Sequence, residues 1–360
     1  MSRTYRIAVI GGDGIGPEVT EAGLVVLGAA EQRFDFRTDR TTLGWSAEAY
    51  IRGARVSAEM IEPLRAYDAI LLGAIGHPDA PRGLPEHDII FGLRRGLDLY
   101  VNLRPIVLYD DRLTPLRGRT TKDIDLVIVR ENTEDVYGRP VARTAEGTAD
   151  ETVKSEMIFT RRGTERIVRY GFELARRRRK RLTLVDKSNA LRLQEIYRTV
   201  LAERARGFPD VESDAMYVDA ASMWLVLHPE RFDVVVTTNL FGDIISDLGA
   251  AVVGGLGTGA SGNIHPGKVS MFEPIHGSAP KYAGQGVASP VGAIGAVALM
   301  LEHLGESEAA RAIDAALRDG FRTGRIKGVD AGSGRTMDVA EAVARSVRDG
   351  PPGRDAGPPG

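Results

Sequence analysis

The chain has 360 residues, of which 43% are hydrophobic and 27% are charged, and its formal net charge at pH 7 is -2. This balance is ordinary for a globular protein and creates no overall field that would attract nucleic acid or a membrane surface. The absence of cysteine excludes disulfide bonds, thiolate metal sites and cysteine nucleophiles. Because the first residues lead directly into a strand pattern, we expect a cytoplasmic protein.

Apolar runs rich in β-branched residues alternate with helical patterns along the chain. The runs that predict strands lie at 5–11, 68–76, 123–132, 181–189 and 232–239, and the helical patterns at 17–30, 161–180, 190–206 and 291–304. This alternation predicts an α/β fold with a largely parallel sheet, whose strand ends carry the functional residues. The apolar run at 291–301 is too short to span a bilayer and predicts a buried helix.

The turn after the first strand is rich in glycine, which raises the question of a nucleotide-binding loop. Residues 9–18 read VIGGDGIGPE. The dinucleotide fingerprint fails because Pro17 stands where the third glycine is required, and the phosphate-loop motif fails because Gly16 is followed by Pro17 and Glu18. The sequence therefore predicts a tight strand-to-helix turn, with Pro17 in the first helical turn.

Three arginines lie beside apolar, strand-like segments. Arg94 and Arg104 bound the segment RRGLDLYVNLR, and Arg130 ends the run DLVIVR. Guanidinium groups bind carboxylates bidentately, so their convergence would predict a substrate with two carboxylates. Three separate surface arginines are the alternative that these residues alone leave open.

Three aspartates are candidate metal ligands. Asp243 and Asp247 are four residues apart in NLFGDIISDLG, which places them on one helix face, and Asp219 follows the strand-like AMYV. Oxygen ligands without His or Cys favour Mg²⁺ or Mn²⁺. Two like charges on one helix face repel unless a cation lies between them, and a solvated helix face is the alternative. Lys187 at a strand end and Tyr137 after RENTED are candidates for proton transfer.

Two segments have a marked composition. The run RRRRKR at 176–181 ends a predicted helix, where cations complement the helix dipole. A solvated helix end is favoured over a nucleic-acid site because no aromatic platform accompanies the run. Residues 349–360, DGPPGRDAGPPG, predict a disordered tail.

Taken together, the motifs resemble those of the metal-dependent β-decarboxylating dehydrogenases, a family that includes 3-isopropylmalate, isocitrate, homoisocitrate and tartrate dehydrogenases. The matching segments are GDGIGPE (12–18), LRRGLDLYVNLRP (93–105), VIVRENTEDVY (127–137), DKSNAL (186–191), NLFGDIISDLG (239–249) and FEPIHGSAP (272–280). The resemblance implies a two-domain α/β fold around one large twisted sheet, which is not a Rossmann fold. It implies a cofactor domain at 1–100 and 254–345, and a substrate, metal and dimerisation domain at 101–253 with an arm near 138–156.

The resemblance also implies the reaction. The 2-hydroxyl of a 3-substituted (2R)-malate would be oxidised by NAD or NADP, and the 3-carboxylate would then leave as CO₂. The implied enzyme is a homodimer with shared sites, in which Lys187 and Asp219 come from the partner chain. The implied site consists of the catalytic Tyr137 and Lys187, the substrate-binding Arg94, Arg104, Arg130, Ile90 and Phe91, the metal ligands Asp219, Asp243 and Asp247, and the cofactor-binding Glu273, His276, Gly277, Ser278, Ala279, Pro280, Lys281, Tyr282 and Ser289.

Five positions bear on the choice between family members. Ile90 and Phe91 offer an apolar pocket that suits 3-isopropylmalate, and Asp88 would repel the third carboxylate of isocitrate. His87 stands where isopropylmalate enzymes have glutamate, which leaves open a tartrate, malate or specialised-pathway substrate. Lys281 stands where NAD-using members have aspartate, which favours NADP. A non-catalytic regulatory subunit is disfavoured because the proton-transfer and metal residues are all present.

Overall fold

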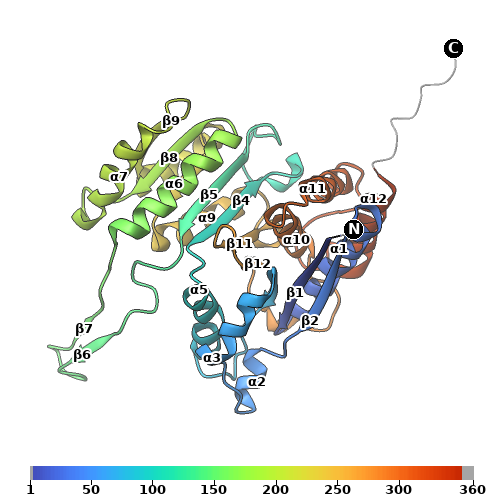
Figure 1. Cartoon of the computed structure of the whole chain (residues 1–360), viewed down its shortest axis with the longest axis horizontal. Coiled ribbons are helices and arrows are strands. Elements are labelled where there is room, and N and C mark those ends of the chain that lie inside the picture. The colour runs from blue at the N-terminus through green and yellow to red at the C-terminus, as the bar shows by residue number, and fades with distance from the viewer. Residues whose placement is uncertain (1–2, 351–360) are drawn as a thin grey trace.

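The computed structural model describes residues 3–350, and a ten-stranded sheet runs through the whole molecule (Figure 1). The strand order is β2-β1-β3-β12-β11-β4-β5-β10-β8-β9. The strands are β1 Arg3–Gly12, β2 Phe36–Thr42, β3 Ala69–Ala74, β4 Val101–Val107, β5 Asp125–Glu131, β8 Arg181–Asp186, β9 Glu212–Tyr217, β10 Val234–Thr237, β11 Ala260–Ile264 and β12 Ser270–Pro274. A separate antiparallel ribbon consists of β6 Ala142–Thr144 and β7 Thr152–Lys154.

The outer parts of the sheet are parallel, as predicted, but its centre is antiparallel. β12 pairs antiparallel with β11, β11 with β4, and β4 with β5. The five predicted strands are confirmed as β1, β3, β5, β8 and β10. The sequence did not predict β11, because its residues ASGNI have low strand propensity. It is a strand because every one of its residues is buried between two neighbouring strands.

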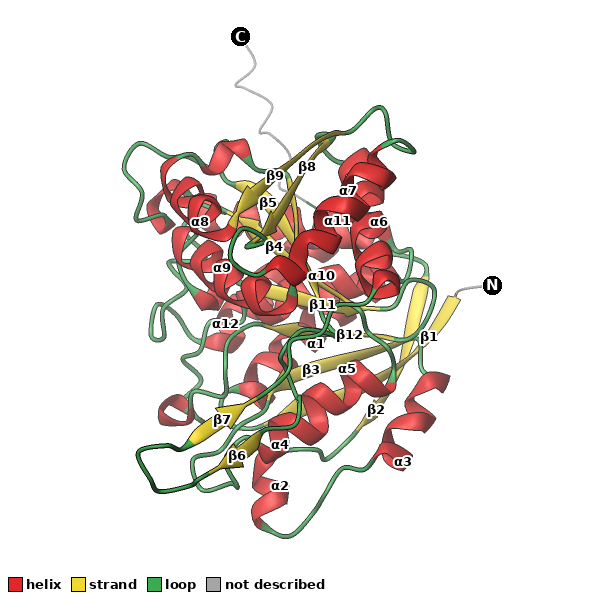
Figure 2. Ribbon diagram, turned by 90° about the vertical axis from the view of Figure 1, so that its left-hand side faces the viewer, coloured by secondary structure: helices red, strands yellow, loops and turns green. Residues whose placement is uncertain are grey.

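Helices cover both faces of the sheet (Figure 2). They are α1 Gly16–Arg33, α2 Ala47–Ile51, α3 Ala58–Ile61, α4 Leu84–Glu86, α5 Gly92–Gly96, α6 Arg161–Arg177, α7 Glu195–Ala205, α8 Val218–Leu227, α9 Asn239–Val252, α10 Val291–His303, α11 Ser307–Arg322 and α12 Thr336–Asp349. The four predicted helices are confirmed as α1, α6, α7 and α10. Within residues 3–350, no helix is both long and apolar enough to cross a membrane.

The alternation of side chains along the strands divides the core unequally between the two faces of the sheet. On one face, Ile7, Val9 and Val129 belong to a single core that extends from α1 and α10 to α6. On the other face, Ala8 lies in a core under α2, α3 and α5, whereas Ile128 lies in a different core under α8 and α9. The central strands lie between these two smaller cores, and their polar side chains form the candidate site.

The ribbon of β6 and β7 extends away from the body of the molecule (Figure 1). Residues 140–156 are all exposed, and the ribbon coincides with the predicted arm near 138–156. The predicted tail at 349–360 lies outside the described residues except for Asp349 and Gly350. Asp349 is the last residue of α12, so the tail starts no earlier than Gly350.

The basic run 176–181 begins in the last turn of α6, at the predicted helix end. Its guanidinium groups face carboxylates from neighbouring elements. Arg176 lies 2.7 Å from Asp210, and Arg178 lies 2.8 Å from the buried Asp233. Much of the charge of the run is therefore compensated within the fold.

Candidate active site

Arg94 from α5, Arg104 from β4 and Arg130 from β5 converge over the centre of the sheet, and all three are buried. Burial lowers the pKa of Arg130 to about 9, with further contributions from the charges of Arg104 and Arg94. Burial also lowers the pKa of Arg94. Cations placed so close together and away from water favour an anionic ligand, because its charge would relieve their repulsion. Convergence, rather than three separate surface arginines, is what the structure shows.

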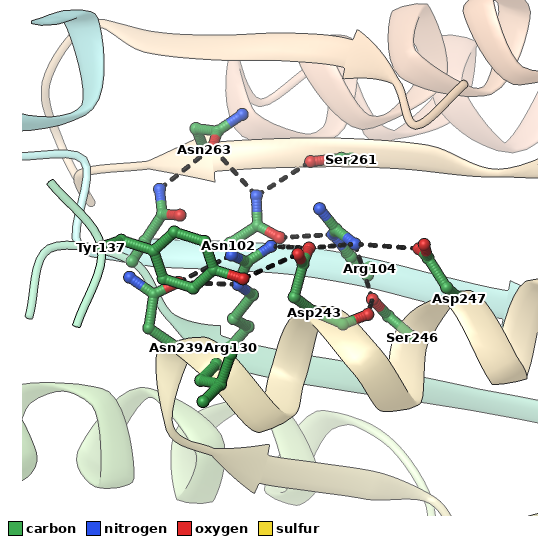
Figure 3. A network of polar contacts seen from close by, with 12 residues as sticks. Asn102, Arg104, Arg130, Tyr137, Asn239, Asp243, Ser246, Asp247, Ser261 and Asn263 are labelled. Carbon is green, nitrogen blue, oxygen red and sulfur yellow. Dashed lines mark hydrogen bonds and ion pairs between the residues drawn. The ribbon is translucent and has the colours of Figure 1, made fainter. Parts of the chain in front are cut away.

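The two carboxylates of α9 face these arginines (Figure 3). Arg104 Nη1 lies 3.3 Å from Asp243 Oδ1 and 3.6 Å from Asp247 Oδ1, so a cation does stand between the like charges. Arg130 pairs with Asp243 and donates two hydrogen bonds to Asn239 Oδ1, at 3.0 and 2.7 Å. Burial raises the pKa of Asp243, but Arg130 and Arg104 outweigh it and the pKa is lowered. For Asp247 burial prevails, and the pKa is raised.

The third candidate ligand, Asp219, does not join this pair. It lies in the first turn of α8, with its side chain 67% exposed, and Lys187 Nζ is 2.9 Å from its Oδ1. Among residues 3–350, no three acidic or histidine side chains are grouped as a metal site. Asp243 and Asp247 offer hard oxygen donors that suit Mg²⁺ or Mn²⁺, but one chain supplies only these two.

Tyr137 meets the same carboxylate from the other side. Its hydroxyl donates a hydrogen bond of 2.9 Å to Asp243 Oδ2 (Figure 3). The Arg130 guanidinium lies 5.3 Å from the centre of its ring, and Phe91 stacks on it with ring centres 5.9 Å apart. Burial, followed by the negative charge of Asp243, raises the pKa of Tyr137 to about 12. The phenol therefore keeps its proton near neutral pH and is a donor.

Buried amides support the site, and sequence reasoning missed them. Asn263 Oδ1 accepts hydrogen bonds from Asn102 Nδ2 (2.9 Å) and Asn132 Nδ2 (3.0 Å), and Asn263 Nδ2 donates to Glu273 Oε1 (2.7 Å). Asn102 Oδ1 in turn accepts from Arg104 Nε at 2.6 Å. The available signal was the polar residue at every second position of a strand whose other side chains are apolar, as in VNLR.

The segment expected to choose the substrate forms a π-helical turn, His87–Phe91, that leads into α5. Ile90 packs against the core under α2, α3 and α5. Asp88 accepts a hydrogen bond from Tyr50 at 3.1 Å and lies 3.0 Å from His87 Nδ1. Asp88 is therefore held in place by two partners from its own surroundings, Tyr50 and His87.

The opening loop packs against the segment expected to bind the cofactor. Ile15 N donates to the carbonyl of Ser278 at 2.8 Å. Gly14 has a φ of +60°, and a Cβ atom there would lie 2.0 Å from the Ser278 oxygen. At Gly12 a Cβ atom would lie 1.9 Å from the carbonyl oxygen of Ala74. These glycines therefore permit close approach of two chain segments, and the loop is the predicted tight strand-to-helix turn, with Pro17 in the first turn of α1.

The other residues expected to bind the cofactor lie in the loop segment between β12 and α10. His276 Nε2 is buried and has no hydrogen-bond partner within residues 3–350, and burial lowers the pKa of this imidazole. Lys281 is exposed, with Nζ 4.6 Å from the centre of the Tyr282 ring. Ser289 Oγ lies 3.5 Å from the Gly257 carbonyl. An unpartnered imidazole nitrogen beside exposed loop residues fits a polar ligand.

The fold and the site together define an α/β protein with a buried cationic site that suits a small anionic ligand. The family model described as isocitrate/isopropylmalate dehydrogenase matches residues 6–343, and the chain belongs to this family of dehydrogenases.

The similar proteins with names include both 3-isopropylmalate dehydrogenases and an isocitrate dehydrogenase. The chain is 46% identical to a 3-isopropylmalate dehydrogenase of Thermobifida fusca, over 96% of this chain and 98% of that protein. It is 48% identical to a 3-isopropylmalate dehydrogenase of Mycobacterium avium, over 87% and 92%. Among solved structures, the isocitrate dehydrogenase of Methylococcus capsulatus superposes with a TM-score of 0.83 at 37% identity, covering 96% of this chain and 99% of that one.

Proposed function

We propose that the chain catalyses the oxidative decarboxylation of 3-isopropylmalate, with NADP or NAD as hydride acceptor. The observation that carries this proposal is the convergence of three buried arginines beside Asp243 and Tyr137, because such a site suits a substrate with two carboxylates. The names of the relatives at 46% and 48% identity support the choice of substrate. A place in leucine biosynthesis and a cytoplasmic location follow as predictions.

The chain's own residues would bind the substrate and move its protons. Arg94, Arg104 and Arg130 bind the two malate carboxylates. Lys187 accepts the proton of the 2-hydroxyl, and Tyr137 donates its proton to C3 of the enol that remains after CO₂ leaves. When bound, the nicotinamide supplies the hydride acceptor and a divalent cation supplies the Lewis acid.

The cation would be Mg²⁺ or Mn²⁺, held by Asp243 and Asp247 of one chain and by Asp219 of the partner subunit. The cofactor would lie against Glu273 and the segment from His276 to Tyr282, with Ser289 near its adenine end. An exposed lysine beside a tyrosine ring favours the extra phosphate of NADP, because a cation attracts a phosphate.

We infer that the enzyme is a homodimer with shared sites. Apolar side chains are exposed on α8 and α9, where Met223 and Leu227 are each 50% exposed and Ile244 is 57% exposed. Such side chains are typical of a subunit interface. Ile244 is next to Asp243, and α8 carries Asp219, so a partner packed there would bring Asp219 and Lys187 toward the α9 carboxylates. The projecting arm offers a second contact.

We further propose the division into a cofactor domain at 1–100 and 254–345 and a second domain at 101–253. The separate cores on the site face support it, because one contains α2, α3 and α5 and the other contains α8 and α9. The site would then lie between the domains.

His87 supports a second candidate substrate. Its side chain is 53% exposed and polar, next to the apolar Ile90 and Phe91. A malate with a smaller or polar substituent at C3, such as tartrate or malate itself, would suit a polar wall better than an isopropyl group. Isocitrate and homoisocitrate are further alternatives, although Asp88 would repel their third carboxylate.

Initial rates would test the proposed reaction. The substrates are 3-isopropylmalate, isocitrate, homoisocitrate, tartrate and malate, each with NAD⁺ and NADP⁺ and with Mg²⁺ or Mn²⁺, and reduced cofactor is measured. We expect the highest rate with 3-isopropylmalate and NADP⁺, and none in the Asp243→Asn variant. A higher rate with tartrate or malate would favour the second candidate, and no rate with any substrate would refute the proposal.

Subunit mixing would test the shared site. Lys187→Ala and Asp243→Asn chains are each inactive alone in this proposal. In mixed dimers one site carries both lesions and the other carries neither, so random mixing should restore about one quarter of the wild-type rate. If Lys187 and Asp243 of the same chain act in one site, the mixture stays inactive.

A further inference from the structure

Asp135, two residues before Tyr137, has an unusual conformation for a buried charged residue. Its side chain is fully buried and its φ is 79°, in the left-handed region that favours glycine. Aspartate tolerates this region better than most residues, but such backbones persist only where the surroundings hold them. The conformation points to a requirement at this position that the proposed mechanism has not used.

The contacts of Asp135 attach the base of the arm to α9. Its Oδ2 accepts a hydrogen bond of 2.9 Å from the backbone N–H of Leu240, in the first turn of α9, and its Oδ1 accepts one of 2.9 Å from Val136 N–H. Thr238, at the N-cap of α9, contributes no side-chain bond to the described helix, so Asp135 takes over that capping role. The N–H of Asp135 also donates to Ile158 O at 3.0 Å, where the arm returns.

Residues 135–137 are therefore attached to α9 at two points, one turn apart. The first is the bond from Leu240 N–H to Asp135, and the second is the bond from Tyr137 to Asp243. The second point has competing partners, since Asp243 also pairs with Arg130 and Arg104 and is a proposed metal ligand. The first is made to the backbone N–H of Leu240, which takes no part in the proposed binding of substrate or metal.

We propose that Asp135 is a positioning residue that keeps the Tyr137 hydroxyl directed at C3 of the substrate when the Asp243 carboxylate is engaged by a metal ion. This inference rests on the proposed role of Tyr137 as proton donor. In that step the phenolic O–H bond breaks and a C–H bond forms at C3, the enol hydroxyl loses its proton to water as C2 becomes a ketone, and the phenolate recovers a proton from water. A phenol that is held on one side of C3 delivers the proton to one face only.

The test follows the face of protonation. The reaction is run in D₂O with 3-isopropylmalate, and the keto-acid product is reduced at once so that the deuterium at C3 can be assigned by NMR. Asp135→Gly keeps the left-handed backbone and removes both acceptors. Asp135→Asn keeps the backbone and one acceptor oxygen. Asp233, a buried carboxylate that accepts a bond from Arg179 N–H at 2.8 Å in the same half of the sheet, is replaced in the same two ways as a matched control.

In Asp135→Gly we expect a kcat at least tenfold lower, with KM for the substrate and Mn²⁺ affinity by electron paramagnetic resonance each within about twofold, and deuterium on both faces of C3. Asp135→Asn should recover part of the stereospecificity. The Asp233 variants should melt at lower temperature but deuterate one face only. If Asp135→Gly does not fold, a fully stereospecific Asp135→Asn with unchanged kcat overturns the proposal, and partial scrambling supports it.

A Tyr137→Phe variant distinguishes the positioning role of Asp135 from the proton-donor role of Tyr137. If it scrambles the deuterium while Asp135→Gly stays stereospecific, the positioning role is refuted and the proposed mechanism stands. If Tyr137→Phe itself protonates one face at the wild-type rate, Tyr137 is not the donor, and both proposals fail together.

Discussion

Replacing Gly242 by alanine should weaken substrate binding and lower stability. This is unexpected at first, because Gly242 lies in a helix, where alanine is normally favoured over glycine. Gly242 is in α9, one residue before Asp243. A Cβ atom there would lie 2.5 Å from Arg130 Cγ and 2.7 Å from Arg130 Cβ. These atoms are at the base of the arginine side chain, which is only 1% exposed, so the side chain cannot rotate away. The new methyl group must therefore displace Arg130.

The magnitude follows from two opposing terms. Alanine in a helix interior is favoured over glycine by about 1 kcal/mol. Forcing a methyl group into a packed interior costs about 1–3 kcal/mol. The net result is a loss of up to about 2 kcal/mol, which lowers the melting temperature of a chain of this length by about 2–3 °C. Displacement of Arg130 from Asn239 and Asp243 weakens charge-assisted hydrogen bonds of about 1.5–3 kcal/mol, so KM for the substrate should rise by tenfold or more.

Gly28 is the matched control. It lies inside α1, its φ is not positive, and a Cβ atom there would have no heavy atom within 4 Å. Gly28→Ala should raise stability by up to about 1 kcal/mol and leave KM unchanged. Melting curves and substrate titrations of both variants would check the reasoning. An equal stability gain in the two variants, with KM unaffected in Gly242→Ala, would refute it.

Three further predictions concern other parts of the molecule. The Glu18 carboxylate accepts a hydrogen bond of 3.2 Å from the N–H of Ala288, the residue before Ser289, which we propose lies near the adenine end of the cofactor. Glu18→Gln weakens one hydrogen bond of about 1 kcal/mol, so it should raise KM for the cofactor about fivefold and leave KM for the substrate unchanged in initial-rate assays. Lys281→Asp should move cofactor preference toward NAD, and an unchanged ratio of kcat/KM values would reject the role of Lys281. The hydrogen bond from Arg176 lowers the pKa of Asp210, so this pair contributes stability above the ordinary aspartate pKa and loses it as pH falls through the lowered value. Asp210→Asn should therefore melt below wild type at pH 6 and together with it near pH 2, and a gap that persists in acid would contradict this.

The sequence predicted β1, β3, β5, β8 and β10 because these strands are continuous apolar runs that end in turn residues. It could not predict β11, where Gly262 and Asn263 replace the usual branched residues and burial by neighbours decides the structure. Spacing along the chain also could not reveal two hydrogen bonds of the site. Arg130 donates to Asn239 and Arg104 donates to Ser246, and each bond joins residues more than a hundred positions apart.

The candidate site was predictable in its chemistry more than in its geometry. Asp243 and Asp247 were placed on one helix face by their spacing, and in the structure Arg104 lies close to both carboxylates. The position of Asp219 depends on where α8 packs, so residue spacing alone could not show that it pairs with Lys187, although the resemblance implied that both come from the partner chain. The sequence also could not predict that Tyr50 donates a hydrogen bond to Asp88, since Tyr50 comes from a different helix.

The order of strands in the sheet has a consequence for synthesis on the ribosome. β3 pairs with β12, and Arg33 at the end of α1 donates to Val347 O in α12 at 2.7 Å, so the N-terminal elements depend on neighbours that are synthesised last. The stretch from β4 to α9 is contiguous and contains a core of its own. We expect this middle stretch to fold while the chain is still emerging, and the N-terminal strands to wait, exposed, until the C-terminal helices have been released.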